Sequence, residues 1–117
     1  MVTVEAAYAI AAMVAVIVLG VGAVVGVSVQ IRCTDAAREA ARLAAAGDPA
    51  ARDTAIRIAG SSARVAVSDD GLRVQVEVRA TMPLLPAVAV SARAVAMKEP
   101  AADGEPESMA SSDPAPP

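Results

Sequence analysis

The chain has 117 residues and a mass of 11.6 kDa, which allows one small domain with an additional segment or two. It contains 30 Ala and 18 Val but a single aromatic residue, so a large enzyme core is not expected. It has no His and one Cys, which excludes His-dependent triads, His- or Cys-rich zinc sites and an intrachain disulfide. A net charge of −3 without stacking aromatics also argues against nucleic-acid binding. We therefore expect no enzyme activity, cofactor, metal ion or small-molecule substrate.

The first predicted element is a membrane helix. From Ala6 to Ile31, 26 consecutive residues carry no charge. A spanning helix needs about 20 apolar residues, whereas the apolar region of a signal peptide has only about 7–15. Residues 1–31 are therefore predicted to form an N-terminal segment with a single transmembrane helix, whose partner is the lipid bilayer.

Residues 32–47 are predicted to extend this helix beyond the bilayer, because they are rich in Ala and other strong helix formers and end at Gly47. The whole helix, from about Thr3 to Ala46, would be about 66 Å long. Its extension carries a stripe of small side chains, namely Cys33, Ala37, Ala40, Ala41 and Ala44. Two acid–base pairs at i,i+3 can form on its surface, Asp35–Arg38 and Glu39–Arg42. Cys33 is interpreted as a small buried residue of the stripe rather than as half of an intermolecular disulfide.

Residues 48–98 are predicted to form a small head that begins with a second, short helix. Asp48-Pro49 is typical of a helix start, with an acidic cap followed by Pro in the first turn. The apolar face of this segment continues to about Ser62.

The rest of the head shows the two-residue period of strands. Asp70-Gly71 indicates a hairpin with a type I′ turn, and apolar residues alternate with polar ones on both sides of it. Pro83 and Pro86 indicate a break before a third, weaker alternation over residues 87–97. The predicted fold class is α+β, with a three-stranded antiparallel meander covered on one face by helix.

Residues 99–117 are predicted to be a disordered tail. They contain five acidic residues, no basic residue and five of the eight prolines, with almost nothing apolar to bury.

One residue stands apart from the apolar run: Glu5 lies at its start. The simple interpretation places this carboxylate in the headgroup region, where its cost is low. However, the motifs MVTVEAAYA at 1–9 and RCTDAAREAARLAAAG at 32–47, followed by a helix and a small sheet, resemble the TadE-like family of pilin-like proteins. This family belongs to the tight-adherence branch of type IV pili, and the resemblance covers roughly residues 1–97.

The resemblance implies processing and assembly. Family precursors carry a basic leader that a prepilin peptidase removes, which leaves an acid at the fifth mature position. Glu5 matches if Met1 is the first mature residue, so Met1 marks the candidate processing site. Either the sequence is already mature, or translation starts further upstream, or the chain is not cleaved. Pairing of Glu5 with the terminal amine of a neighbouring subunit would neutralise both groups and set the register between helices.

Three glycines in the apolar run, Gly20, Gly22 and Gly26, are candidates for close helix packing, because Gly22 and Gly26 have GxxxG spacing. The alternative is that glycine is simply frequent in membrane helices.

The orientation signals conflict. Three Arg residues follow the apolar run within residues 32–42 and no basic residue precedes it, which by the positive-inside rule places the head in the cytoplasm. The resemblance implies a head outside the cytoplasm, and a basic leader would restore the expected charge bias. We expect a single-pass cell-membrane protein with its C-terminal head outside the cytoplasm, and a location in a pilus or an extracellular one as the further option.

The expected function is that of a minor pilin or pseudopilin, a structural component of a tight-adherence pilus or related secretion machine. Its partners would be other pilin subunits, pilus assembly proteins and a prepilin peptidase. The alternative is a membrane-anchored or secreted surface protein whose head is a binding module acting on another cell. Co-purification with pilus components would favour the first function, and soluble release without them the second.

Overall fold

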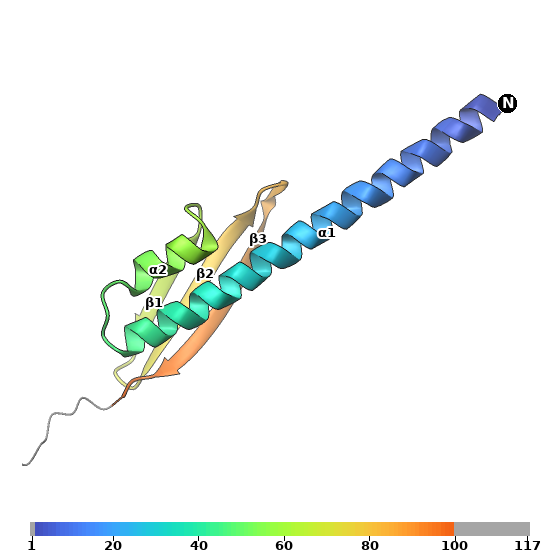
Figure 1. Cartoon of the computed structure of the whole chain (residues 1–117). Coiled ribbons are helices and arrows are strands. Elements are labelled where there is room, and N and C mark those ends of the chain that lie inside the picture. Colours follow the sequence, from blue (N-terminus) through green and yellow to red (C-terminus); the bar gives the residue numbers. More distant parts are fainter. Residues whose placement is uncertain (1, 100–117) are drawn as a thin grey trace, which may run out of the picture.

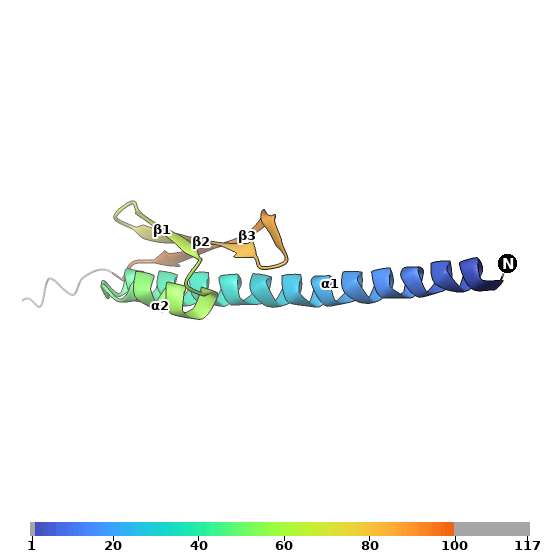
Figure 2. The same cartoon turned by 90° about the horizontal axis from the view of Figure 1, so that it is seen from above.

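The computed structural model describes residues 2–99, which form two helices and a three-stranded sheet. The elements are α1 (Val2–Ala45), α2 (Ala51–Ala59), β1 (Arg64–Asp69), β2 (Arg73–Met82) and β3 (Leu85–Met97). The two helices lie in one layer and the sheet lies in a second layer against them (Figures 1 and 2). The predicted α+β arrangement of a long apolar helix, a short helix and an antiparallel sheet is confirmed. Met1 and, apart from Glu99, the tail predicted to be disordered lie outside the described residues.

Helix α1 has 44 residues and agrees with the predicted span to within one residue at each end. It stops where predicted because Gly47 adopts a positive φ of 75°, which glycine reaches without steric cost. The N–H groups of Gly47 and Asp48 then donate to the carbonyls of Ala44 and Leu43. This is the Schellman arrangement that satisfies the last carbonyls of a helix.

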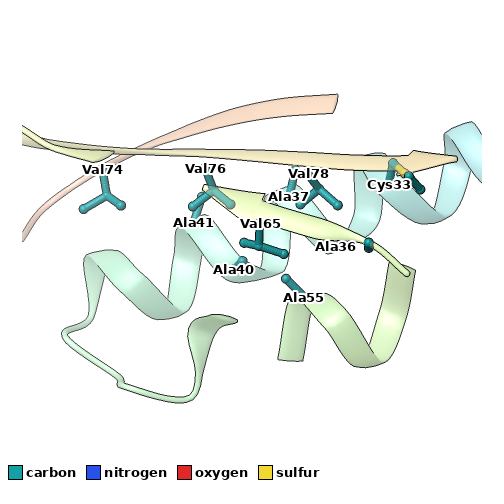
Figure 3. Close-up of a cluster of buried hydrophobic side chains, with 12 residues drawn as sticks. Cys33, Ala36, Ala37, Ala40, Ala41, Ala55, Val65, Val74, Val76 and Val78 are labelled. Carbon is teal, nitrogen blue, oxygen red and sulfur yellow. The ribbon is translucent and has the colours of Figure 1, made fainter. Parts of the chain in front are cut away.

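The core lies between the C-terminal half of α1 and the sheet. The small side chains of α1 that face it are fully buried: Cys33, Ala36, Ala37, Ala40 and Ala41. Val74, Val76 and Val78 of β2 point toward them from the sheet (Figure 3). The predicted stripe is confirmed for Cys33, Ala37, Ala40 and Ala41, with Ala36 as an additional member, while Ala44 is only half-buried. Because alanine side chains are short, the helix backbone can approach the sheet closely, and the β-branched valines fill the space between the layers.

The sheet has the order β1-β2-β3, and both pairings are antiparallel. Residues of β2 alternate as predicted, with the valines directed to the helices and Arg73, Gln75, Glu77 and Arg79 on the opposite face. Ala92, Ala94 and Ala96 of β3 pair with the β2 valines and are half-buried. One face of the sheet is therefore apolar and covered, whereas the other is polar and open, as is usual for antiparallel sheets.

The turn between β1 and β2 differs from the predicted type I′ turn. A type I′ turn needs positive φ at both central residues, but only Gly71 has it, with a φ of 92°. The central residues are Gly71 and Leu72, one position later than predicted. The reason is that Asp70 is the residue that precedes the two central residues of the turn. Its Oδ1 accepts hydrogen bonds from the N–H groups of Leu72 and Arg73, at 3.1 and 2.7 Å.

Two other boundaries also shift. Helix α2 is shorter than predicted and runs from Ala51 to Ala59, although Oδ1 of Asp48 accepts a hydrogen bond from the N–H of Ala50 at 2.8 Å, as a capping acid would.

Strand β3 begins at Leu85, between the two prolines that were expected to bracket a break. Met82 pairs with Leu85 but Thr81 pairs with Ala89, so the intervening residues form an irregularity. Pro86 is tolerated there because an irregular edge strand does not need its N–H.

We predict that Gly71→Val destabilises the fold by about 1 kcal/mol or more, because the positive φ is unfavourable for a β-branched residue. A Cβ at this position would meet no atom within 4 Å, so the loss would arise from the backbone and not from a clash. Thermal unfolding of the full chain in detergent measures the effect. Leu72→Val is the matched control, since Leu72 is exposed and does not have a positive φ. Equal stability of the two variants would contradict the turn geometry.

We also predict that Ala40→Leu destabilises the packing of α1 on the sheet by about 1–3 kcal/mol, because Ala40 has no exposed surface and the larger side chain must separate the layers. Ala12→Leu places the same side chain on an exposed position of the same helix. Circular dichroism melting should show a loss only for Ala40→Leu. An unchanged melting temperature in both variants would mean that the helix does not pack as closely as the structure indicates.

Candidate functional site

The exposed N-terminal half of α1 is the main candidate functional surface. Every residue from 2 to 21 is exposed, including large apolar side chains such as Ile10 and Leu19, which are 65% and 73% exposed. The helix is long and apolar enough to cross a membrane, and none of its most apolar window is buried in the structure. The core helix of a soluble protein would be mostly buried, so this segment has the properties of a membrane anchor.

Glu5 lies in the first turn of α1 and is exposed. Within residues 2–99 it forms no ion pair with another side chain. Its neighbours in sequence are apolar or small, and the exposed Tyr8 follows one turn later. Glu5 is thus an isolated carboxylate at the N-terminal end of α1, where the helix packs against no other element in the described part of the chain.

The three glycines of the apolar run do not form a single open surface. An added Cβ would meet nothing within 4 Å at Gly20 or Gly22. At Gly26 it would lie 2.8 Å from Cε of Met82, which belongs to the end of β2. Gly26 therefore accommodates a side chain of the head, while Gly20 and Gly22 leave room for a neighbouring helix.

The contact at Gly26 belongs to a longer covered face of α1, which sequence reasoning missed. Four residues at helical spacing, Val25, Gly26, Val29 and Gln30, are half-buried. The β2–β3 hairpin lies beside this part of the helix (Figures 1 and 2). Nε2 of Gln30 donates to the carbonyl of Ser91 at 3.4 Å. The sequence signal that could have found this contact is the absence of charge between Arg79 and Arg93.

The open face of the sheet carries a small charge network. Oε1 and Oε2 of Glu77 accept hydrogen bonds from Arg79 and Arg93, at 2.8 and 2.9 Å. The bond from Arg93, and then that from Arg79, hold the pKa of Glu77 below its usual value. At the end of the sheet, Lys98 pairs with Asp69, and this contact lowers the pKa of Asp69, with a further contribution from the N–H of Gly71.

One of the two predicted ion pairs on the surface of α1 forms, and Cys33 is buried as expected. Glu39 and Arg42 form the expected ion pair at 2.6 Å, which lowers the pKa of Glu39, whereas no such pair joins Asp35 and Arg38. Cys33 is a free, fully buried cysteine, and burial raises the pKa of its thiol. Its place in the core agrees with the interpretation as a small buried residue, and a raised pKa makes it a poor nucleophile.

An open groove of about 480 Å³ lies between the end of α1 and β3, lined among others by Arg38, Arg42, Val95 and Glu99. Within residues 2–99, no three His, Cys, Asp or Glu side chains come together in a way that could hold a metal ion. The groove therefore offers charge on its rim but no recognisable arrangement of catalytic groups.

We predict that the fold loses stability in acid, and that Glu77 contributes to this loss. Its folded-state pKa lies below the ordinary value of 4.5, so the stabilisation is present above that value and is lost as the pH falls through the lowered pKa. The effect should be modest because both arginines are largely exposed to solvent. Melting temperatures between neutral pH and about pH 3 should fall less for Glu77→Gln than for the unmodified chain. Parallel curves would show that the network does not contribute.

Comparison with known proteins found one curated relative. The chain is 52% identical over 97 residues to a Mycobacterium tuberculosis protein named "Apoptosis inhibitor Rv3655c", and the alignment covers 82% of this chain and 78% of that protein. No family model matches the chain, and no solved structure matches it.

Proposed function

We propose that this chain, which belongs to the family of the Mycobacterium tuberculosis Apoptosis inhibitor Rv3655c, is a membrane-anchored, pilin-like assembly protein. The support for this proposal is its fold and its resemblance to the TadE-like family. It would be a minor pilin or pseudopilin of a tight-adherence pilus or related secretion machine, as the TadE-like resemblance implies. The proposal assigns it a structural role and no catalytic activity.

The observation that carries the proposal is the division of α1 into two halves with different surroundings. Residues 2–21 are exposed and uncharged apart from Glu5, while residues 33–41 contribute a buried alanine face to the head. An apolar helix of this length needs either lipid or other helices around it. A subunit that is first stored in a membrane and later packed laterally against copies of itself would be surrounded by lipid at the first stage and by other helices at the second.

Glu5 supports the same proposal. A carboxylate in an apolar assembly is costly unless it is paired with a positive group. The terminal amine of a neighbouring subunit would supply that group and would fix one axial register for the two helices. Gly20 and Gly22, which have open space beside them, would allow the neighbouring helix to approach closely.

The proposed location follows from the same elements. The single crossing of the cell membrane would lie within residues 6–31, and the head would stand outside the cytoplasm, as in the TadE-like family. A prepilin peptidase would act immediately before Met1. The partners are then membrane lipid, other pilin subunits and the pilus assembly proteins.

A second candidate function is favoured by the name of the relative. That relative is named an apoptosis inhibitor, and such a name is compatible with a head that is presented or released as a binding module for a molecule of another cell. The anchored pilin-like fold is compatible with this role, because a surface-exposed assembly also presents its heads. Soluble release of the chain without pilus components would favour this second function, and co-purification with them would favour the first.

We predict that Glu5→Ala and Glu5→Gln reduce pilus or secretion output strongly while leaving membrane insertion intact. Removal of an acid from the end of an apolar run can only ease insertion, but it removes the partner of the neighbouring amine. Glu5→Gln keeps the shape and the hydrogen bonding and loses only the charge. Output and membrane-bound subunit should be measured in parallel in the native host.

Asp35→Asn is the matched control, because Asp35 is an exposed acid on the same helix beyond the apolar run. It should leave both output and membrane level unchanged. Normal output from both Glu5 variants at normal membrane levels would contradict the register role and would leave Glu5 as an interfacial residue.

A further inference from the structure

The end of the β2–β3 hairpin lies beside the apolar part of α1 and not beside its charged part. Met82 contacts Gly26, and the side chain of Gln30 reaches the backbone of Ser91. The hairpin thus runs from the level of Gln30 toward the N-terminal end of α1, as Figures 1 and 2 both show. Its tip is level with the second half of the uncharged run of the helix.

The chemistry of the tip matches that position. The 13 residues between Arg79 and Arg93 carry no charge, and the turn itself is Pro83-Leu84. Leu84 and Leu85 are 61% and 55% exposed, although the rest of the open sheet face is mainly polar. Pro83 is a common turn residue, but an exposed leucine in the turn followed directly by a second one at the start of β3 is unusual, because turns in water favour Gly, Pro, Asn, Asp and Ser.

The length of the helix places this tip at a membrane boundary. The hydrocarbon core is about 30 Å thick, and a helix crosses it in about 20 residues. If Glu5 lies at one edge, the other edge falls near Val25, which is one residue from the Met82 contact. The leucines of the tip would then be at the level where the acyl chains meet the headgroups.

Basic side chains lie on the far side of this boundary. Arg79 and Arg93 end the uncharged stretch of the hairpin, and Arg32 ends that of the helix. Arg32 is two positions beyond Gln30, whose partner Ser91 pairs across the sheet with Arg79. Arg32 and Arg79 therefore lie at similar heights, and Arg93 lies two residues further from the tip. Arg79 and Arg93 share the carboxylate of Glu77, so the three arginines keep a net positive charge where phosphate groups of the lipids would meet them.

We propose that the tip of the β2–β3 hairpin, residues 82–88, is a second membrane contact that inserts into the outer interface beside α1. The proposal rests on the membrane anchoring in the proposed function and adds a lipid-binding surface on the head. Two attachment points would hold the head in a fixed orientation on the bilayer until the subunit is extracted for assembly. Lipid is favoured over a second copy because the tip is continuous with the apolar surface of the anchor.

The test uses single-tryptophan variants of the full chain, which itself contains no Trp. Leu84→Trp reports on the tip, and Val14→Trp reports on the anchor. Leu72→Trp is the matched control, because Leu72 is a similarly exposed leucine in the turn at the opposite end of the sheet. Each variant is reconstituted into phosphatidylcholine/phosphatidylglycerol vesicles with and without acyl-chain-brominated phosphatidylcholine, which quenches only tryptophan in contact with lipid. Circular dichroism checks that each variant is folded.

Brominated lipid should reduce the emission of Leu84→Trp and Val14→Trp by about two-fold and leave Leu72→Trp unchanged. The control also accounts for the general tendency of Trp to seek interfaces. Quenching at Val14 but not at Leu84 would overturn the inference and leave the anchor intact, and a blue-shifted but unquenched Leu84→Trp would show that protein covers the tip. Loss of quenching at Val14 as well would overturn the membrane anchoring on which both proposals rest.

Discussion

The packing of the alanine face of α1 against the valines of β2 is the interaction on which the rest of the molecule depends. The buried side chains of the head are small, and the largest fully buried ones are Val74, Val76, Val78 and Cys33. Each such residue buries little apolar area, so the fold gains stability from close contact of many small groups rather than from a few large ones. A sheet of three strands cannot supply this contact alone. The C-terminal half of α1 is therefore part of the head's core and not a linker to it.

This dependence has a mechanical consequence. The same helix continues without interruption from the core into the exposed apolar segment. The direction in which this segment leaves the head is therefore set by how α1 packs on the sheet. The contact between Met82 and Gly26 extends the packed region by about two turns beyond Cys33. The packed region of the head thus reaches into the uncharged part of the helix.

The sequence predicted those features that arise from local patterns. The bounds of α1 were predicted from the uncharged run and the alanine stripe. The buried face of β2 was predicted from the alternation of residues from Val74 to Val78. The predicted position of the turn was wrong where a side chain competed with the backbone for hydrogen bonds. Asp70 accepts hydrogen bonds from two backbone N–H groups, and the turn lies one residue later than predicted. The contact of the hairpin with residues 25–30 of α1 could not be predicted, because it depends on the register of a hairpin irregularity between Thr81 and Ala89. A two-residue period indicates a strand but does not say what lies beside its end.

The same contact limits how copies of this chain could assemble. A neighbouring helix packed against Gly26 would compete with Met82 for the same space, and the hairpin would have to move aside. No such competition exists N-terminal to Gly22, where α1 is exposed all round. A lateral assembly through residues 2–21 leaves the head unchanged, whereas one that uses the whole GxxxG pair requires rearrangement of the β2–β3 hairpin. Glu5 lies in the unobstructed part, so a register set by that residue is compatible with the head as it is folded.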